Sequence, residues 1–72
     1  MRTSKNVVIY ENTKIGREPV IEDFVILGKP PRGFKSGELE LTIGDFSVLR
    51  CGTIIYAGNV IGNNFETGDN AR

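Results

Sequence analysis

The fold of this chain is decided by residues 41–62, LTIGDFSVLRCGTIIYAGNVIG, in which an aliphatic residue stands at every sixth position. The same frame runs through the first part of the chain, and its anchors are Ile9, Ile15, Ile21, Leu27, Ile43, Leu49, Ile55 and Ile61, with Thr67 next in step. An α-helix buries residues three or four apart, and a half-buried strand buries every second residue. A repeat of six therefore predicts short structural units that stack on one another.

Each unit of six reads as a short strand followed by a corner. Glycine follows four of the anchors, at Gly16, Gly28, Gly44 and Gly62, and glycine accepts tight backbone conformations that a side chain would penalise. A second column stands two positions before each anchor, and strand alternation points it to the same side. Its members are Val7, Thr13, Pro19, Val25, Leu41, Ser47, Thr53, Asn59 and Phe65. Three units, about eighteen residues, would close one turn of an all-β parallel solenoid; a small β-sandwich is the alternative interpretation.

The frame is interrupted once, between Leu27 and Ile43, which are sixteen positions apart. Either one unit of six residues spans this gap with ten extra residues, or two units span it with four extra residues. The ten-residue interpretation sorts the outward residues, which directly precede the anchors, into one apolar wall, one mostly apolar wall and one mixed wall. These walls are Val8, Ile26 and Ile54; Val20, Val48 and Glu66; and Lys14, Thr42 and Val60. We therefore predict a loop over residues 28–42, where Gly, Pro and charged residues are frequent.

Size and composition exclude several classes of protein. The chain has 72 residues, which is enough for one domain, and its formal net charge is zero. Without a basic stripe, nucleic acid is not an expected partner. No apolar run is long enough for a membrane helix, so we expect a cytoplasmic protein that does not enter the membrane. Cys51 is the only cysteine and the chain contains no His to activate it, so we interpret it as a small residue near a corner.

Several segments resemble the hexapeptide-repeat acyltransferases, and more narrowly the N-terminal coils of enzymes that acetylate sugars or nucleotide sugars. They are Leu27-Gly28-Lys29-Pro30-Pro31-Arg32-Gly33, Ile43-Gly44-Asp45, Thr53-Ile54-Ile55-Tyr56-Ala57-Gly58 and Ile61-Gly62-Asn63-Asn64-Phe65-Glu66-Thr67-Gly68. The resemblance implies a single-stranded left-handed parallel β-helix of about three coils. Its handedness comes from the resemblance alone, because crossovers between parallel strands are generally right-handed. The resemblance also implies a homotrimer, acetyl-coenzyme A as cofactor and a His as general base.

The chain departs from that family at the expected chemistry. It has no His and reads Thr67-Gly68-Asp69 where similar sequences commonly carry Thr-Gly-His. Asp69 and Glu66 are therefore the candidate catalytic residues, although an exposed carboxylate is a weak base at neutral pH and a structural corner role is the competing interpretation for Asp69. Lys29, Arg32 and Lys35 are the candidates for contacting cofactor phosphates, and a solvated loop is the alternative. A zinc site like that of the carbonic anhydrases sharing this β-helix needs several His, so we expect no metal.

Two functions follow from these observations. The first is acetyl-CoA-dependent O- or N-acetyl transfer to a sugar or nucleotide sugar, by a longer protein of which residues 1–72 form the N-terminal part. The repeat is still running at Thr67 and no polar cap follows, and on this interpretation the 72 residues alone are inactive. The second is a noncatalytic trimeric scaffold or regulatory module that uses its apolar outer wall. A short natural chain capped by self-association is the alternative to a longer protein.

Overall fold

The structure is a computed structural model that describes residues 2–69. In this range the chain is all-β, with nine short strands and no helix. The strands are β1 (Arg2–Thr3), β2 (Val8–Ile9), β3 (Thr13–Ile15), β4 (Val20–Ile21), β5 (Ile26–Lys29), β6 (Leu41–Ile43), β7 (Val48–Leu49), β8 (Ile54–Tyr56) and β9 (Val60–Ile61). The described residues accordingly include no helix that could cross a membrane.

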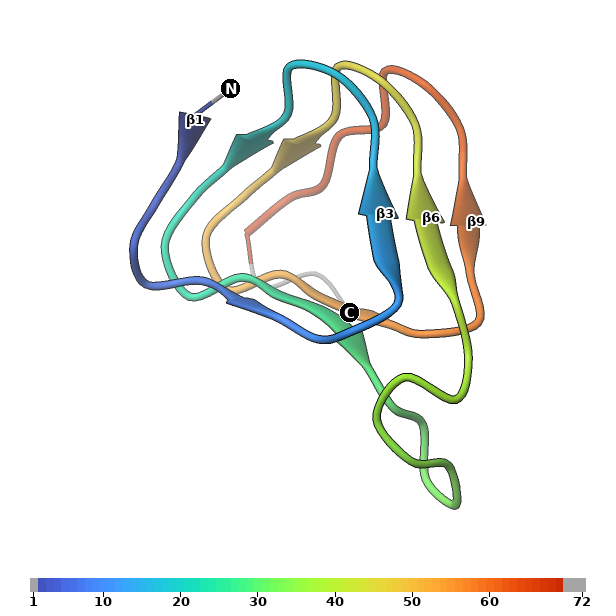
Figure 1. Cartoon of the computed structure of the whole chain (residues 1–72). Coiled ribbons are helices and arrows are strands. Elements are labelled where there is room, and N and C mark those ends of the chain that lie inside the picture. Colours follow the sequence, from blue (N-terminus) through green and yellow to red (C-terminus); the bar gives the residue numbers. More distant parts are fainter. Residues whose placement is uncertain (1, 70–72) are drawn as a thin grey trace.

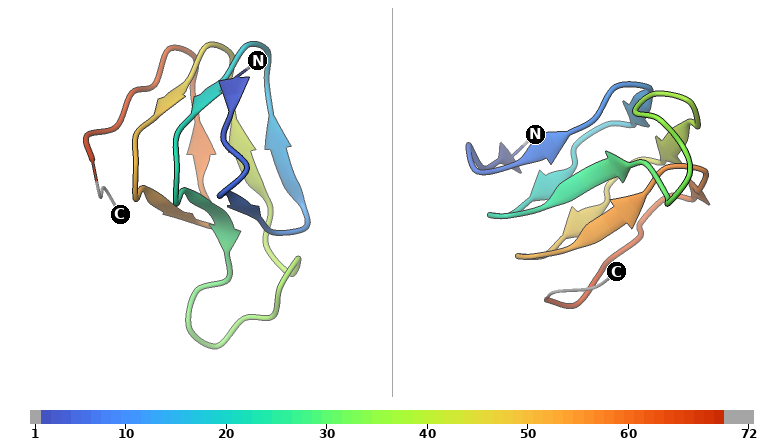
Figure 2. Two further views of the ribbon diagram at one scale, coloured as in Figure 1. Left: turned by 90° about the vertical axis from the view of Figure 1, so that its left-hand side faces the viewer. Right: turned by 90° about the horizontal axis from the view of Figure 1, so that it is seen from below.

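The strands form three parallel sheets, which we call sheet A (β1-β4-β7), sheet B (β2-β5-β8) and sheet C (β3-β6-β9). The chain visits A, B and C in turn and then returns to A, and we call each such circuit a pass. Viewed along the direction in which the passes stack, the sheets form the three sides of a triangle around one core (Figure 1). Figure 2 shows the passes lying side by side from the N-terminal to the C-terminal end.

The strand register confirms the ten-residue interpretation of the interruption. Val8 pairs with Ile26, eighteen positions later, whereas Ile15 pairs with Ile43, twenty-eight positions later. Ile43 in turn pairs with Ile61, at the shorter spacing again. The pairings also place the outward residues on the three walls that the sequence predicted, including an isolated bridge between Val48 and Glu66 that begins a fourth pass.

The irregular segment between β5 and β6 covers residues 30–40, which is shorter than the predicted 28–42. Gly28 has a φ of +79°, and the register of β5 against β8 shifts across it, so the strand continues to Lys29. At the other end Leu41 pairs with Thr13 and is fully buried, which holds it in the sheet. The segment projects from the triangle in Figure 1 as a narrow loop.

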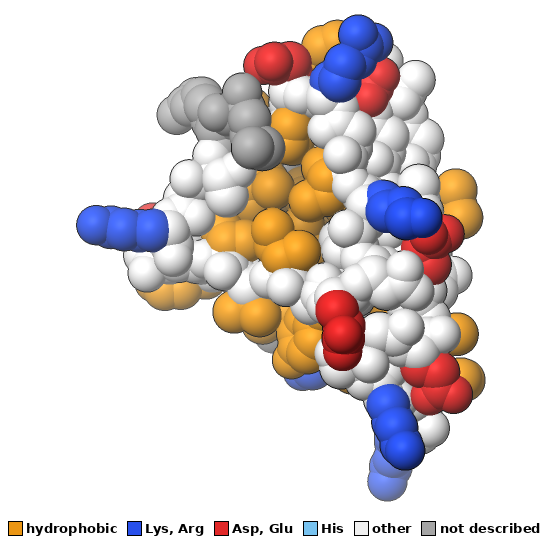
Figure 3. Space-filling model, in the orientation of Figure 1, with side chains coloured by type: hydrophobic (Ala, Val, Ile, Leu, Met, Phe, Trp, Pro, Cys, Tyr) orange, Lys and Arg blue, Asp and Glu red, His pale blue; other side chains and the backbone are white. Residues whose placement is uncertain are grey.

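The core is formed by the middle of the stack. Five anchors are buried, namely Ile21, Leu27, Ile43, Leu49 and Ile55. Ile15 and Ile61 are partly buried, but the prediction that Ile9 is buried is wrong, since its side chain is 46% exposed. Ile9 belongs to the first pass, which has a neighbouring pass on one side only, and Figure 3 shows apolar side chains open at this end.

The second column of inward-pointing residues is likewise buried only in the middle of the stack. Its buried members are Pro19, Val25, Leu41, Ser47 and Thr53. Val7 and Thr13 of the first pass are partly buried, and Asn59 and Phe65 near the C-terminal end are exposed. Burial therefore depends on the position of the pass in the stack as well as on the direction of the side chain.

We expect Leu49→Ala to lower the free energy of unfolding by about 2–5 kcal/mol, because Leu49 is fully buried and its truncation leaves a cavity. Val60 is 86% exposed, so Val60→Ala should change stability by no more than about 0.5 kcal/mol. Urea unfolding followed by circular dichroism measures both. Equal effects of the two substitutions would contradict the assignment of the inward and outward columns.

Candidate functional site

A polar ladder runs along the corner between sheets C and A, which we call the C–A corner (residues 16–19, 44–47 and 62–65). Asp45 accepts a hydrogen bond from the backbone N–H of Arg17 through Oδ1 (2.8 Å), and Asn63 accepts one from the N–H of Asp45 (2.7 Å). Arg17 Nη2 also lies 3.3 Å from Asp45 Oδ2. The backbone hydrogen bond from Arg17, assisted by the guanidinium, lowers the pKa of Asp45. These side chains join successive passes and are structural.

The corner glycine of one pass makes room for the ladder side chain of the following pass. A Cβ on Gly16 would lie 2.2 Å from Asp45 Oδ1, and one on Gly44 would lie 2.3 Å from Asn63 Oδ1. Both positions would also meet backbone atoms of the next pass at 2.8 Å. Gly62 occupies the same place in the third pass, but a Cβ there would meet nothing within 4 Å.

The candidate catalytic residues Glu66 and Asp69 are brought together beside Arg50. They line one shallow hollow of about 240 Å³, and Glu66 Oε2 lies 3.1 Å from Arg50 Nη2. The hydrogen bond that Arg50 donates to Glu66 raises the pKa of Arg50, so this guanidinium stays charged. Glu66 is therefore held in an ion pair. Asp69 is exposed, and the burial that its role as a base requires is missing.

A hydroxyl pair anchors the beginning of the fourth pass next to this hollow. Thr53 Oγ1 and Thr67 Oγ1 are 2.8 Å apart, and the backbone N–H of Arg50 donates to Thr67 Oγ1 at 2.9 Å. Thr67 is buried, as its place in the six-residue frame predicts. Both hydroxyls are thus engaged in holding one pass on another.

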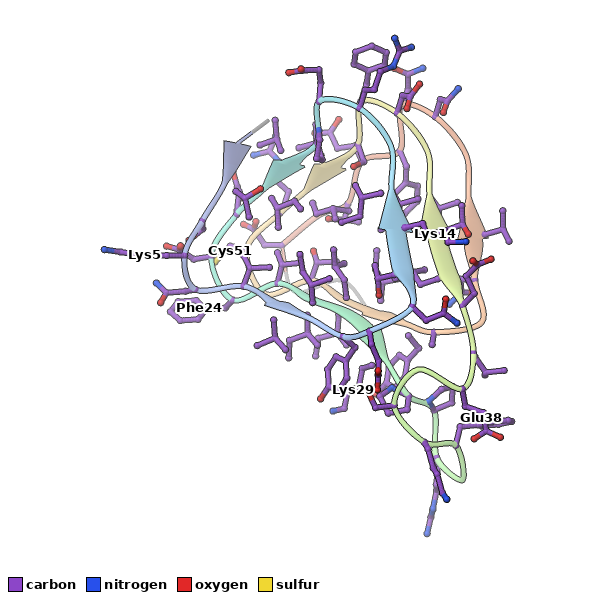
Figure 4. All side chains as sticks on the ribbon, in the orientation of Figure 1. Lys5, Lys14, Phe24, Lys29, Glu38 and Cys51 are labelled. Carbon is purple, nitrogen blue, oxygen red and sulfur yellow. The ribbon has the colours of Figure 1, made fainter. Side chains whose placement is uncertain are left out.

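The three candidate phosphate ligands do not form one site. Lys29 lies on strand β5, where its Nζ is 5.9 Å from the centre of the Tyr56 ring (Figure 4). Arg32 and Lys35 are exposed in the loop, and the backbone N–H of Lys35 donates to Glu38 Oε1 at 2.9 Å. None of the three lines the hollows described in this section.

A further hollow, of about 630 Å³, lies where sheet A turns towards sheet B, and sequence reasoning did not find it. Its lining residues are Thr3, Ser4, Val20, Ile21, Glu22, Asp23 and Cys51. Ser4 Oγ donates a hydrogen bond to Asp23 Oδ1, and the backbone N–H of Cys51 donates to Glu22 Oε1 at 3.0 Å. The signal that could have found it is spacing, since Ser4 and Glu22 are eighteen positions apart and therefore stack.

The chemistry available to this hollow is limited. Cys51 is a free, partly buried thiol at the corner that follows β7, in line with its predicted location. A thiol needs a base or a cation to become a nucleophile, and the chain has no His. Among the described residues no three His, Cys, Asp or Glu side chains are grouped to hold a metal ion.

No family model, curated protein or solved structure matches this chain. The resemblance to hexapeptide-repeat acyltransferases therefore remains a prediction, and function has to be argued from the geometry.

The lowered pKa of Asp45 predicts how acid acts on the C–A corner. A carboxylate whose pKa is lower in the folded state stabilises the fold above its unfolded pKa of about 4, and this contribution is lost as the pH falls through the folded value. Asp45→Asn keeps an oxygen for the Arg17 N–H but does not titrate. Between pH 7 and pH 3 we expect the urea midpoint of the natural chain to fall further than that of Asp45→Asn.

The control is Asp45→Ala, which removes the acceptor and should be less stable than the natural chain at pH 7. The Lys14–Glu40 ion pair, which lowers the pKa of Glu40, is present in all three proteins and cancels in the comparison. The same pH dependence for the natural chain and Asp45→Asn would contradict the assigned role of the carboxylate.

Proposed function

We propose that this chain is a left-handed parallel β-helix of the hexapeptide-repeat type, and that it serves as the scaffold part of an acyltransferase. Three observations support the fold: the six-residue frame, the parallel pairing in all three sheets, and the eighteen-residue spacing between passes. In Figure 1 the ribbon turns anticlockwise as the chain recedes from the viewer, which favours the left-handed form. The reaction class is acetyl transfer from acetyl-coenzyme A to a sugar or nucleotide sugar.

The observation that carries the proposal is the glycine at position 62. At Gly16 and Gly44 the next pass leaves no room for a Cβ, whereas at Gly62 the space is open. The same end of the stack has a mainly apolar hollow of about 220 Å³, whose lining includes Ile55, Ile61 and Phe65. We infer that another pass with a similar corner packs against this end of the stack.

In the proposed enzyme the described residues provide structural support, and we assign none of them as the general base. Glu66 is paired with Arg50, Asp69 is exposed, and the ladder carboxylate of Asp45 is engaged with the backbone N–H and the guanidinium of Arg17. Acetyl-coenzyme A would supply the activated acetyl thioester. Its phosphates require converging donors, and Lys29, Arg32 and Lys35 do not converge, so we assign no cofactor contact to this chain.

The second candidate function is a noncatalytic scaffold or regulatory module that assembles as a homotrimer. The observation that favours it is the apolar character of the outer faces of sheets A and B. These faces carry Val8, which is 52% exposed, and the half-buried Val20, Ile26, Val48 and Ile54, with Glu66 at the end of the row on sheet A. Apolar residues that gather on an outer face are typical of an interface, and closed rings are the common form of self-association.

Acetyl transfer separates the two candidates. We expect purified residues 1–72 to release no coenzyme A from acetyl-coenzyme A above the protein-free rate, with sugar and nucleotide-sugar acceptors, as measured by thiol detection. The complete gene product should release it if the acyltransferase proposal is right. Turnover by the 72 residues would contradict the assigned scaffold role, and Glu66→Gln and Asp69→Asn would then identify the base. A gene product that neither turns over nor binds acetyl-coenzyme A would favour the scaffold.

The corner glycines test whether another pass is present. In residues 1–72 we expect Gly44→Ala to be strongly destabilising, because the new Cβ meets backbone and side-chain atoms of the next pass, and Gly62→Ala to be neutral or slightly stabilising. In the complete gene product Gly62→Ala should become destabilising as well. Thermal unfolding of the four proteins gives the comparison, and a Gly62→Ala that stays neutral in the gene product would contradict a further pass.

A further inference from the structure

The N-terminal end of the stack is an open face of the core. Strands β1, β2 and β3 stand at the edges of their sheets, so each is paired on one side only within the described part of the chain. Of the inward residues in this pass, Ile9 is 46% exposed and Val7 is partly buried, and Figure 3 shows apolar side chains inside the triangle at this end. Unpaired strand edges beside an apolar core are a template for a further strand.

The backbone of β2 directs hydrogen-bonding groups towards this open end. The N–H groups of Val8 and Tyr10 donate to carbonyls of the second pass at 3.0 and 2.9 Å, and the carbonyl of Asn6 accepts from a second-pass N–H at 2.8 Å. Successive residues of a strand direct their N–H and C=O groups to opposite edges. The groups of Val7 and Ile9 therefore face away from the second pass.

The shape of this end fits a second copy of itself. The first pass advances along the stack by one strand spacing, about 4.8 Å, so β1 lies outermost, β2 in the middle and β3 innermost. A twofold axis through β2, perpendicular to the stack, places β1 of each copy over β3 of the other, and the outer part of one end fills the inner part of the other. The same axis runs the two β2 strands antiparallel, with Val7 of one copy opposite Ile9 of the other.

Charge distinguishes this axis from the two others that a triangle allows. The first pass has Lys5 at the corner between sheets A and B, Glu11 at the corner between B and C, and Arg17 at the C–A corner, all exposed. An axis through β2 sets Lys5 of each copy opposite Glu11 of the other. An axis through β1 sets Glu11 against Glu11, and an axis through β3 sets Lys5 against Lys5. Only the axis through β2 brings opposite charges together at both of these corners.

We propose that two copies of this chain join at their N-terminal ends, with strand β2 of one copy paired antiparallel to β2 of the other. Val7 and Ile9 supply the backbone hydrogen bonds and extend the apolar core from one copy into the next. Lys5 and Glu11 form two equivalent ion pairs, as expected of a contact that closes on itself. This contact uses the end of the stack and goes beyond the proposed function, because the homotrimer described above uses the sides.

Charge reversal tests the pairing. We expect Lys5→Glu and Glu11→Lys each to raise the dissociation constant of the dimer about tenfold, because like charges then face each other, and the double variant to return within about twofold of the natural chain. Sedimentation equilibrium at micromolar concentrations measures the constants, and circular dichroism checks the fold. Lys35→Glu is the matched control, since it makes the same change of charge in the exposed loop.

Amide hydrogen exchange provides an independent measurement. The N–H of Ile9 faces the open end, whereas the N–H of Val8 is bonded within the chain. As the protein concentration rises through the dissociation constant, we expect exchange at Ile9 to slow by at least about tenfold and exchange at Val8 to change much less.

The outcomes that would contradict the inference are distinct. A chain that is monomeric at micromolar concentrations would overturn it. So would a chain that associates while Ile9 exchanges at the same rate at every concentration, because the copies would then meet elsewhere. Single variants that weaken the dimer without recovery in the double variant would overturn the pairing of Lys5 with Glu11. None of these results bears on acetyl transfer, which has its own test.

Discussion

The structure depends on the backbone hydrogen bonds that tie each pass to the next. Gly16 donates to the carbonyl of Ile43 and Gly44 donates to the carbonyl of Ile61, both at 2.8 Å, so successive passes are held at the spacing of paired strands. At this spacing a residue's neighbours are its equivalents in the passes before and after. The glycines at the C–A corner, the carboxylate of Asp45 and the aliphatic anchors are all consequences, because each must fit against the same position of the adjoining pass.

Much of this arrangement could be predicted from the sequence, because a packing constraint that acts once in each unit produces a six-residue period in the sequence. The inward direction of Leu27 and Leu49 follows from the six-residue frame. The pairing of Ile15 with Ile43 follows from the way outward residues sort into walls. The loop is shorter than predicted, because Gly28 permits a bulge and strand β5 continues to Lys29. A bulge depends on the partner strand, so the local sequence does not reveal it.

Other features could not be predicted because they depend on how the stack ends or on contacts between passes. The frame directs Ile9 inward, but it does not say that the first pass lies uncovered on one side. The positive φ of Glu18, Phe24 and Phe46 could not be predicted either, because these residues stand where a corner favours glycine or asparagine. For the candidate site, the six-residue frame correctly predicted that Glu66 lies on the outer wall of sheet A and that Thr67 is buried. The partnership of Glu66 with Arg50 and the hollow beside Cys51 arise from contacts between passes that no single unit contains.

The polar side chains of Asp45, Asn63, Thr53 and Thr67 hold successive passes together, whereas the outward apolar residues of sheets A and B are not enclosed by this chain. This division is the physical reason for proposing a scaffold whose chemistry is supplied elsewhere. The ten extra residues between β5 and β6 set every strand pairing across the loop. Scalar couplings through hydrogen bonds, measured by nuclear magnetic resonance on labelled protein, test this pairing most directly. We predict a coupling between the amide nitrogen of Gly16 and the carbonyl carbon of Ile43, whereas a coupling from Gly16 to the segment around Gly33 would contradict the fold.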